Sequence, residues 1–151
     1  MTRLALAIAL VAALGCTSDS APTAPSPTAG PNTGPWTGTA ADAVNGTGTL
    51  HLDLTELTID ATRSLLGGTW RAEFTAVPPA SGTVAGLRTG TTVQIVLQPT
   101  TPPPCPSAPL PGTTGTFSAV NLSLDGTAIS GEYAYAACTG AVTGTLSIRR
   151  R

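Results

Sequence analysis

Short segments in which apolar and polar residues alternate recur through most of the chain, and they constrain the fold more than any other feature. A period of two places successive side chains on opposite faces of a β-strand, so each segment predicts a strand with one buried face. The clearest segments are residues 50–54, 70–74, 93–98, 120–124, 129–135 and 142–148. Shorter stretches near Trp36 and Val84 raise the expected number to about eight strands, at the roughly 8–12-residue spacing of all-β domains.

The composition favours strands over helices. The chain has 17 Gly and 14 Pro, and its seven basic residues are all Arg, so that it contains no Lys. Few strong helix formers remain besides Ala and Leu, whereas Thr and Val favour strands and Gly and Pro favour turns. We therefore expect an all-β domain, a small antiparallel meander of about eight strands that closes into a barrel. A two-sheet sandwich is the alternative.

Three positions suggest interruptions between or within strands. The apolar residues change phase at Leu57 and Ile59, which lie on odd positions, so we expect a bulge or turn near Glu56. Gly67-Gly68 is expected to break the chain before the next alternating segment begins. Asp125-Gly126 is a strong signal for a tight hairpin turn.

The N-terminal residues follow a different pattern. Arg3 precedes an unbroken apolar run at residues 4–14, which is shorter than the roughly twenty residues of a spanning helix and typical of a signal peptide. The run ends in Ala13-Leu14-Gly15-Cys16. In this motif the chain resembles bacterial lipoprotein precursors, whose lipobox ends in a small residue followed by a cysteine.

The resemblance implies that residues 1–15 are removed and that Cys16 becomes a lipidated N-terminus. Ala13 departs from the family's pattern, in which Leu is commonest at that position. The alternative is a conventional signal peptide that ends in an incidental cysteine. Two or three acyl chains hold a protein firmly, whereas one binds only marginally, so the implied partner is a membrane reached through the N-terminal lipid.

The expected organisation has three parts. Residues 1–15 form the signal peptide, and residues 16–35 form the lipidated cysteine with a disordered tether rich in Pro, Ser and Thr. Residues 36–151 form the β domain. The implied location is the cell envelope, and Thr17, rather than Asp, after the cysteine favours the outer membrane if the organism has two membranes.

The β domain has a faint likeness to avidin-like and lipocalin-like barrels. Two Gly-x-Trp stretches and the segment SGEYAYAACTGAVTGTLSIRR at residues 130–150 carry it, through a repeated Ser/Thr-Gly-x-Tyr/Leu pattern. The likeness concerns architecture and implies no function.

Two cysteines remain if Cys16 is lipidated. Cys105 lies in a proline-rich loop and Cys138 ends an expected strand. An exported protein meets oxidising conditions, so we expect these two residues to form a disulfide. Two unrelated free thiols are the alternative.

The side chains that usually mark an enzyme are mostly missing. His51 is the only histidine, so one chain cannot build a two-histidine metal site, and no Gly-x-Ser-x-Gly elbow nominates a nucleophile. We therefore expect no catalytic residues, no metal and no cofactor. The net charge of −1 gives no case for nucleic acid. We expect the basic cluster at residues 149–151 to be a solvated end, with contact to anionic lipid as the alternative.

The aromatic residues are the one feature that could indicate a ligand. Trp70 and Phe74 share one face of their strand, and Tyr133 and Tyr135 share one face of another. These four side chains either fill the core or line a small apolar pocket at the barrel mouth. Two functions follow: a non-catalytic envelope lipoprotein with a structural or interaction role, which we favour, or a barrel of calycin type that binds a small apolar ligand.

Overall fold

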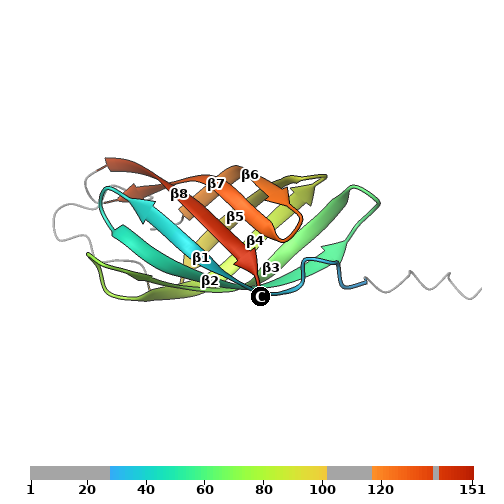
Figure 1. Cartoon of the computed structure of the whole chain (residues 1–151), viewed down its shortest axis with the longest axis horizontal. Coiled ribbons are helices and arrows are strands. Elements are labelled where there is room, and N and C mark those ends of the chain that lie inside the picture. The colour runs from blue at the N-terminus through green and yellow to red at the C-terminus, as the bar shows by residue number, and fades with distance from the viewer. Residues whose placement is uncertain (1–27, 102–116, 138–139) are drawn as a thin grey trace, which may run out of the picture.

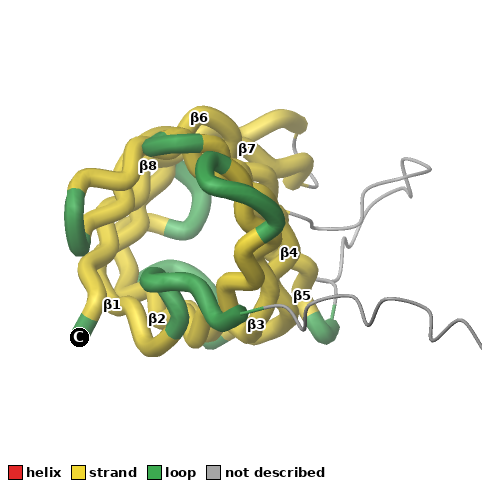
Figure 2. The backbone as a smooth tube through the Cα atoms, turned by 90° about the vertical axis from the view of Figure 1, so that its right-hand side faces the viewer, coloured by secondary structure: helices red, strands yellow, loops and turns green. Residues whose placement is uncertain are grey.

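Eight antiparallel strands form a closed barrel in the computed structural model, which describes residues 28–101, 117–137 and 140–151. Each strand pairs with its neighbours in the chain, and β1 closes the barrel against β8 (Figures 1 and 2). This confirms the all-β, eight-stranded barrel predicted from the sequence and excludes the sandwich. The strands are β1 Gly34–Asp42, β2 Gly46–Thr58, β3 Arg63–Phe74, β4 Ala80–Thr89, β5 Thr92–Pro99, β6 Phe117–Asp125, β7 Ala128–Ala137 and β8 Gly140–Arg150.

The barrel has two ends with different coverings. Strands β2 and β8 finish at one end of the barrel, and residues 28–33 lie against the barrel there. We call these residues the strap and this end the strap end. The opposite end carries the β1–β2 and β3–β4 connections, and we call it the loop end. In Figure 1 the strap end lies to the right and the loop end to the left.

The strap is joined to β2 by backbone hydrogen bonds. Ala29 forms a β-bridge with Leu57, and the Gly30 amide donates to the Glu56 carbonyl at 2.7 Å. The Thr58 amide donates to the Thr28 carbonyl at 3.3 Å. Residues 28–35, which the composition assigns to the tether, therefore lie against the barrel in the structure.

Inward-facing residues of the eight strands fill the barrel. Alternation puts apolar or small residues inside at almost every second position, and burial of each large apolar side chain contributes about 1.5–3 kcal/mol. Trp36 and Leu54 are each 1% exposed, while Leu122 and Ile148 are fully buried. The other large members are Leu50, Leu52, Leu66, Trp70, Val84, Val93, Ile95, Leu97, Ile129, Tyr133 and Leu146.

Strand β2 continues without a bulge past Glu56, so that prediction was wrong. Its pairing with β3 is regular from Gly48 to Thr58. Glu56 occupies the next inward position after the buried leucines and is fully buried, whereas Leu57 and Ile59 are 36% and 51% exposed. The apolar phase shift therefore marks exposed outer residues, and a charged residue fills the interior.

Strand β3 likewise continues through Gly67-Gly68, where a break was expected. Gly68 has a φ of +136°, and a Cβ there would overlap the carbonyl oxygen of Asp53 on β2. Glycine thus allows a close approach between strands. The hairpin predicted at Asp125-Gly126 is confirmed, because Asp125 pairs with Ala128 and Gly126 has a φ of +57°.

Candidate functional site

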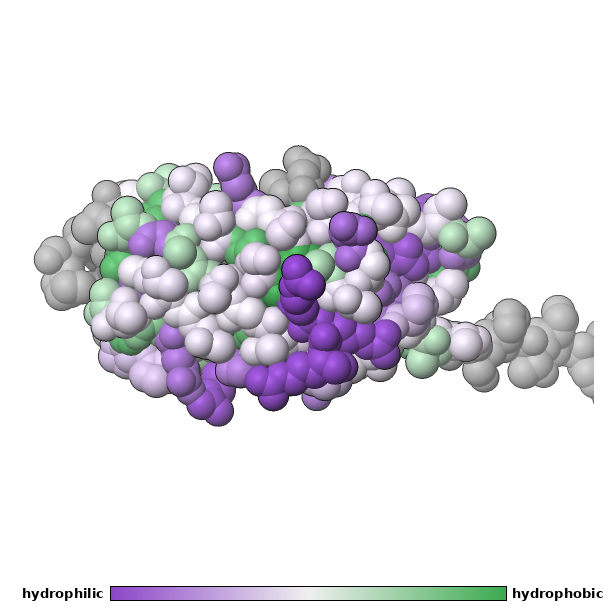
Figure 3. All heavy atoms as spheres, viewed as in Figure 1, coloured by the Kyte–Doolittle hydropathy of each residue, from purple (hydrophilic) through white to green (hydrophobic). Residues whose placement is uncertain are grey.

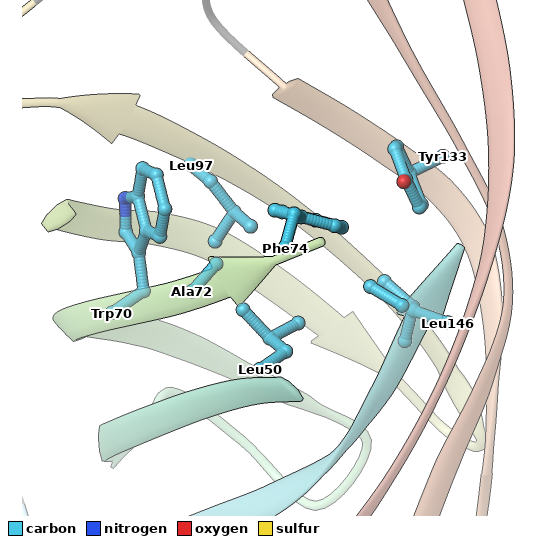
Figure 4. Close-up of a pocket in the computed structure, with 8 residues that line it drawn as sticks. Leu50, Trp70, Ala72, Phe74, Leu97, Tyr133 and Leu146 are labelled. Atoms are coloured by element: carbon cyan, nitrogen blue, oxygen red, sulfur yellow. The ribbon is translucent and has the colours of Figure 1, made fainter. Parts of the chain in front are cut away.

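A small apolar cavity lies inside the barrel towards the loop end (Figure 4). Its volume is about 20 Å³, close to the space that one water molecule needs. Trp70, Ala72 and Phe74 project into it from β3 (Figure 4). The other lining residues are Ala40, Leu50, Leu97, Tyr133 and Leu146. A ligand larger than a water molecule therefore needs a lining side chain to move.

The four aromatic residues singled out from the sequence are brought together in this half of the barrel. Trp70 and Tyr133 are 4% and 5% exposed and belong to the core, whereas Phe74 and Tyr135 are partly buried against it. Trp70, Phe74 and Tyr133 line the cavity. Tyr135 stacks on Tyr133, with ring centroids 6.3 Å apart and an angle of 22° between the rings.

A polar cluster of Asp42, Asn45, Tyr133 and Tyr135 lies beside the cavity at the loop end; we call it the loop-end cluster. The Tyr133 hydroxyl donates to Asp42 Oδ2 at 2.5 Å, and the Tyr135 hydroxyl donates to Asp42 Oδ1 at 3.3 Å. Asn45 Nδ2 donates to Asp42 Oδ2 at 2.9 Å and to the Tyr135 oxygen at 2.8 Å. The amides of Val44 and Asn45 also donate to Asp42.

The hydrogen bonds in the loop-end cluster set the charge of its members. Burial alone would raise the pKa of Asp42, but the bonds from Asn45, Tyr133 and Val44 outweigh it and lower that pKa. Burial and the Asp42 carboxylate raise the pKa of Tyr133, and they raise the pKa of Tyr135 to about 12. Near neutral pH the cluster is therefore one carboxylate held by two protonated phenols, an arrangement that ties β7 to the β1–β2 turn.

A second polar cluster lies at the strap end and consists of Glu56, Arg88, Ser64 and Asn32; we call it the strap-end cluster. Arg88 Nε contacts Glu56 Oε1 at 2.6 Å, and Arg88 Nη2 donates to Ser64 Oγ at 2.9 Å. The backbone and side-chain nitrogens of Asn32 donate to Glu56 Oε2 at 2.7 and 2.9 Å. Trp36 Nε1 donates to the Asn32 carbonyl at 3.0 Å. The cluster thus binds the strap from inside the barrel.

Glu56 is ionised in this cluster. Burial would raise the pKa of its carboxyl group, but the hydrogen bond and charge of Arg88, together with bonds from Asn32 and Ser64, bring that pKa below its ordinary value. The sequence alone did not predict either cluster, because Asp42, Glu56 and Arg88 belong to no motif. The one available signal was Glu56 itself, which continues the even-numbered row of inward leucines.

Several of the sequence-predicted residues lie outside the described ranges. Cys16, Cys105 and Cys138 are among them, so the lipidation and the disulfide stay predictions. His51 is described, and its Nδ1 lies 2.9 Å from Thr37 Oγ1. Within the described residues, no group of three or more His, Cys, Asp or Glu side chains is arranged to hold a metal ion. The same residues include no helix long and apolar enough to cross a membrane.

The fold and the site define a closed, eight-stranded up-and-down β-barrel with a largely filled interior and a polar cluster near each end. Comparisons of the chain find no matching family model, no similar curated protein and no similar solved structure. Its function must therefore be argued from its own residues.

Proposed function

We propose that the protein is a lipid-anchored, non-catalytic lipoprotein of the cell envelope, with a structural or interaction role. The anchor is Cys16, on the strength of the apolar run at residues 4–14 and the Gly15-Cys16 junction. In a bacterium with two membranes, Thr17 favours the outer one.

The observation that best supports this proposal is the attachment of the strap. From Thr28 onward the chain is held by β2 and by the buried Glu56 carboxylate. A carboxylate that accepts charge-assisted bonds makes stronger contacts than neutral groups do. These contacts fix the segment that follows the anchor to one end of the barrel. Such an attachment suits a protein displayed at a membrane surface.

The anchor is tested by replacing Cys16 with serine. Cells grown with a fatty-acid probe should label the wild type, whereas Cys16→Ser should carry no label, because serine provides no thiol for the diacylglyceryl group. A matched control is the double variant Cys105→Ser, Cys138→Ser, which retains only Cys16 and should label like the wild type. Equal labelling of Cys16→Ser and the wild type contradicts the proposal.

Binding of a small apolar ligand is the second candidate function. The cavity between Trp70, Phe74 and Tyr133 supports it, since three aromatic rings surround one apolar space. The volume of about 20 Å³ weighs against a preformed site, because ligand pockets typically measure about 300–1,000 Å³.

Phe74→Ala distinguishes the two functions. If Phe74 packs the core, its removal should lower the denaturant midpoint markedly, with a loss approaching the about 3–5 kcal/mol typical of a buried Phe. The wild type should then show no saturable change of tryptophan fluorescence with apolar ligands. Phe74→Leu is the control, because it keeps most of the apolar volume and should remain near wild-type stability. A near-normal midpoint for Phe74→Ala together with saturable quenching would place ligand binding first.

A further inference from the structure

Three large apolar side chains are exposed together on the outer wall at the strap end. Leu57, Ile59 and Leu65 are 36%, 51% and 51% exposed. Leu57 of β2 lies directly opposite Leu65 of β3, and side chains opposite each other on one face are in contact range. We call these three residues the apolar patch. In Figure 3 hydrophobic surface is visible at the right-hand tip, over the turn between β2 and β3.

Arginine residues gather at the same end. Arg149 and Arg150 close strand β8, Arg151 follows them, and all three are exposed. Arg150 Nη1 donates to the Pro31 carbonyl of the strap, and the Arg151 amide donates to the Pro35 carbonyl at 3.0 Å. These arginines therefore belong to the folded barrel. Figure 3 shows strongly hydrophilic surface where β8 ends.

The two halves of the barrel differ in net charge. Of the arginines in the described residues, all except Arg71 lie in the half nearer the strap, and Arg71 is ion-paired with Glu73. Asp42, Glu73 and Glu132 lie in the other half. The strap half also holds Asp53, Glu56, Asp60 and Asp125, of which Glu56 is paired with Arg88 and Asp60 with Arg63. Arg149, Arg150 and Arg151 leave the strap half the more positive of the two, and positive surface is attracted to anionic lipid headgroups.

The strap begins beside the apolar patch. Thr28 is bonded to Thr58, between Leu57 and Ile59 in the chain. Thr28 is the twelfth residue after Cys16, and a chain of that length spans at most about 40–43 Å. The membrane that holds the lipid therefore lies no farther than this distance from Thr28 at the strap end. The loop end is separated from Thr28 by the length of strand β2.

We propose that the strap end is a membrane-contact surface that rests on anionic phospholipid. The apolar patch enters the interfacial region, as apolar faces of peripheral proteins do. Arg149 and Arg151 bind headgroup phosphate, for which guanidinium has a matching geometry. This inference rests on the proposed lipid anchor and adds to it a fixed orientation, with the cavity and the loop-end cluster directed away from the membrane.

The test uses the full-length lipidated protein, reconstituted in vesicles of phosphatidylglycerol and phosphatidylethanolamine. A photo-crosslinking residue is introduced as Ile59→p-benzoylphenylalanine. The matched control is Val44→p-benzoylphenylalanine, because Val44 is 43% exposed, comparable to Ile59, and lies at the loop end. After illumination, mass spectrometry should detect lipid adducts several-fold more abundant at position 59 than at position 44.

The charge contribution is measured in the same assay. Arg149→Gln together with Arg151→Gln should reduce the adducts at position 59 in vesicles that contain phosphatidylglycerol. The reduction should be much smaller in vesicles of phosphatidylcholine alone, where headgroups carry no net charge. Arg150 is left unchanged, because it contacts the strap.

Failure of the orientation and failure of the anchor give different results. If intact mass shows lipid on Cys16 but adducts are equal at positions 59 and 44, the contact surface is wrong and the anchor stands. If position 59 cross-links to a second copy of the chain instead of to lipid, the patch is a protein interface and the inference is overturned. If Cys16 carries no lipid, the proposed function fails, and with it the orientation.

Discussion

Replacing Arg88 with leucine is expected to destabilise the barrel by about 3–5 kcal/mol, because it leaves a buried carboxylate without its cation. The Glu56 side chain is 0% exposed and the Arg88 side chain 15% exposed, so water cannot replace the lost contact. Asn32 and Ser64 still donate to the cluster, but neither supplies a positive charge. The measurement is urea unfolding at neutral pH, followed by the fluorescence of the two tryptophans.

The control for this variant is Arg71→Leu. Arg71 and Glu73 also form an ion pair, but their side chains are 64% and 45% exposed, and such surface pairs contribute little. We expect a midpoint near that of the wild type. If Arg71→Leu and Arg88→Leu lower the free energy of unfolding equally, burial does not explain the contribution of the Glu56–Arg88 pair to stability.

The effect of Arg88→Leu should also depend on pH. In the wild type the folded-state pKa of Glu56 is lowered, so its contribution to stability is present above the ordinary pKa of about 4.5 and is lost as the pH falls through the lowered value. Without Arg88, burial raises the pKa of Glu56, and protonation then removes the uncompensated charge. The difference between wild type and variant should therefore shrink between pH 7 and pH 4. A difference that stays constant over this range would contradict the ionised state of Glu56.

Trp36→Ala is expected to cost about 3–5 kcal/mol, as truncation of a buried aromatic side chain generally does. Trp36 is 1% exposed at the strap end, and its Nε1 donates to the carbonyl of Asn32. The variant should therefore lose both core packing and one of the contacts that hold the strap. Urea unfolding measures the first effect, and limited proteolysis within residues 28–33 measures the second.

Trp36→Phe separates the two contributions. Phenylalanine retains most of the buried surface but has no N–H group, so we expect a smaller loss, dominated by the missing hydrogen bond at about 0.5–1.5 kcal/mol. It should still increase cleavage of the strap. If the urea midpoint of Trp36→Ala is near that of the wild type, Trp36 does not pack the core at the strap end.

Local patterns were sufficient to predict most of the barrel wall. A period of two assigns each residue to one face without knowledge of its partners, so the strands containing Trp70, Ile129 and Ile148 were predicted from sequence alone. The same rule gave a wrong prediction near Glu56, because the change of phase at the exposed Leu57 and Ile59 indicated a bulge or turn that β2 does not have. Apolar residues on an outer wall look the same in sequence as apolar residues inside.

The candidate site was only partly predictable. The aromatic residues could be grouped because rings in a chain with few of them are expected to be buried. Whether they fill the core or leave a space depends on how side chains from β1, β2, β3, β5, β7 and β8 meet. Packing of that kind follows from the registers of all the strands together, and no single segment carries it.

The sequence by itself determined the all-β class, the approximate number of strands and the hairpin at Asp125-Gly126, since each depends on neighbours within a few residues. Only the tertiary structure decided the pairs that cross the barrel. Glu56 meets Arg88 across 32 residues, and Asp42 meets Tyr133 across 91. The strap was decided in the same way, because Asn32 is held by a buried carboxylate that lies 24 residues away. Hydrogen bonds of this kind depend on distance in space, and closure of the barrel sets that distance.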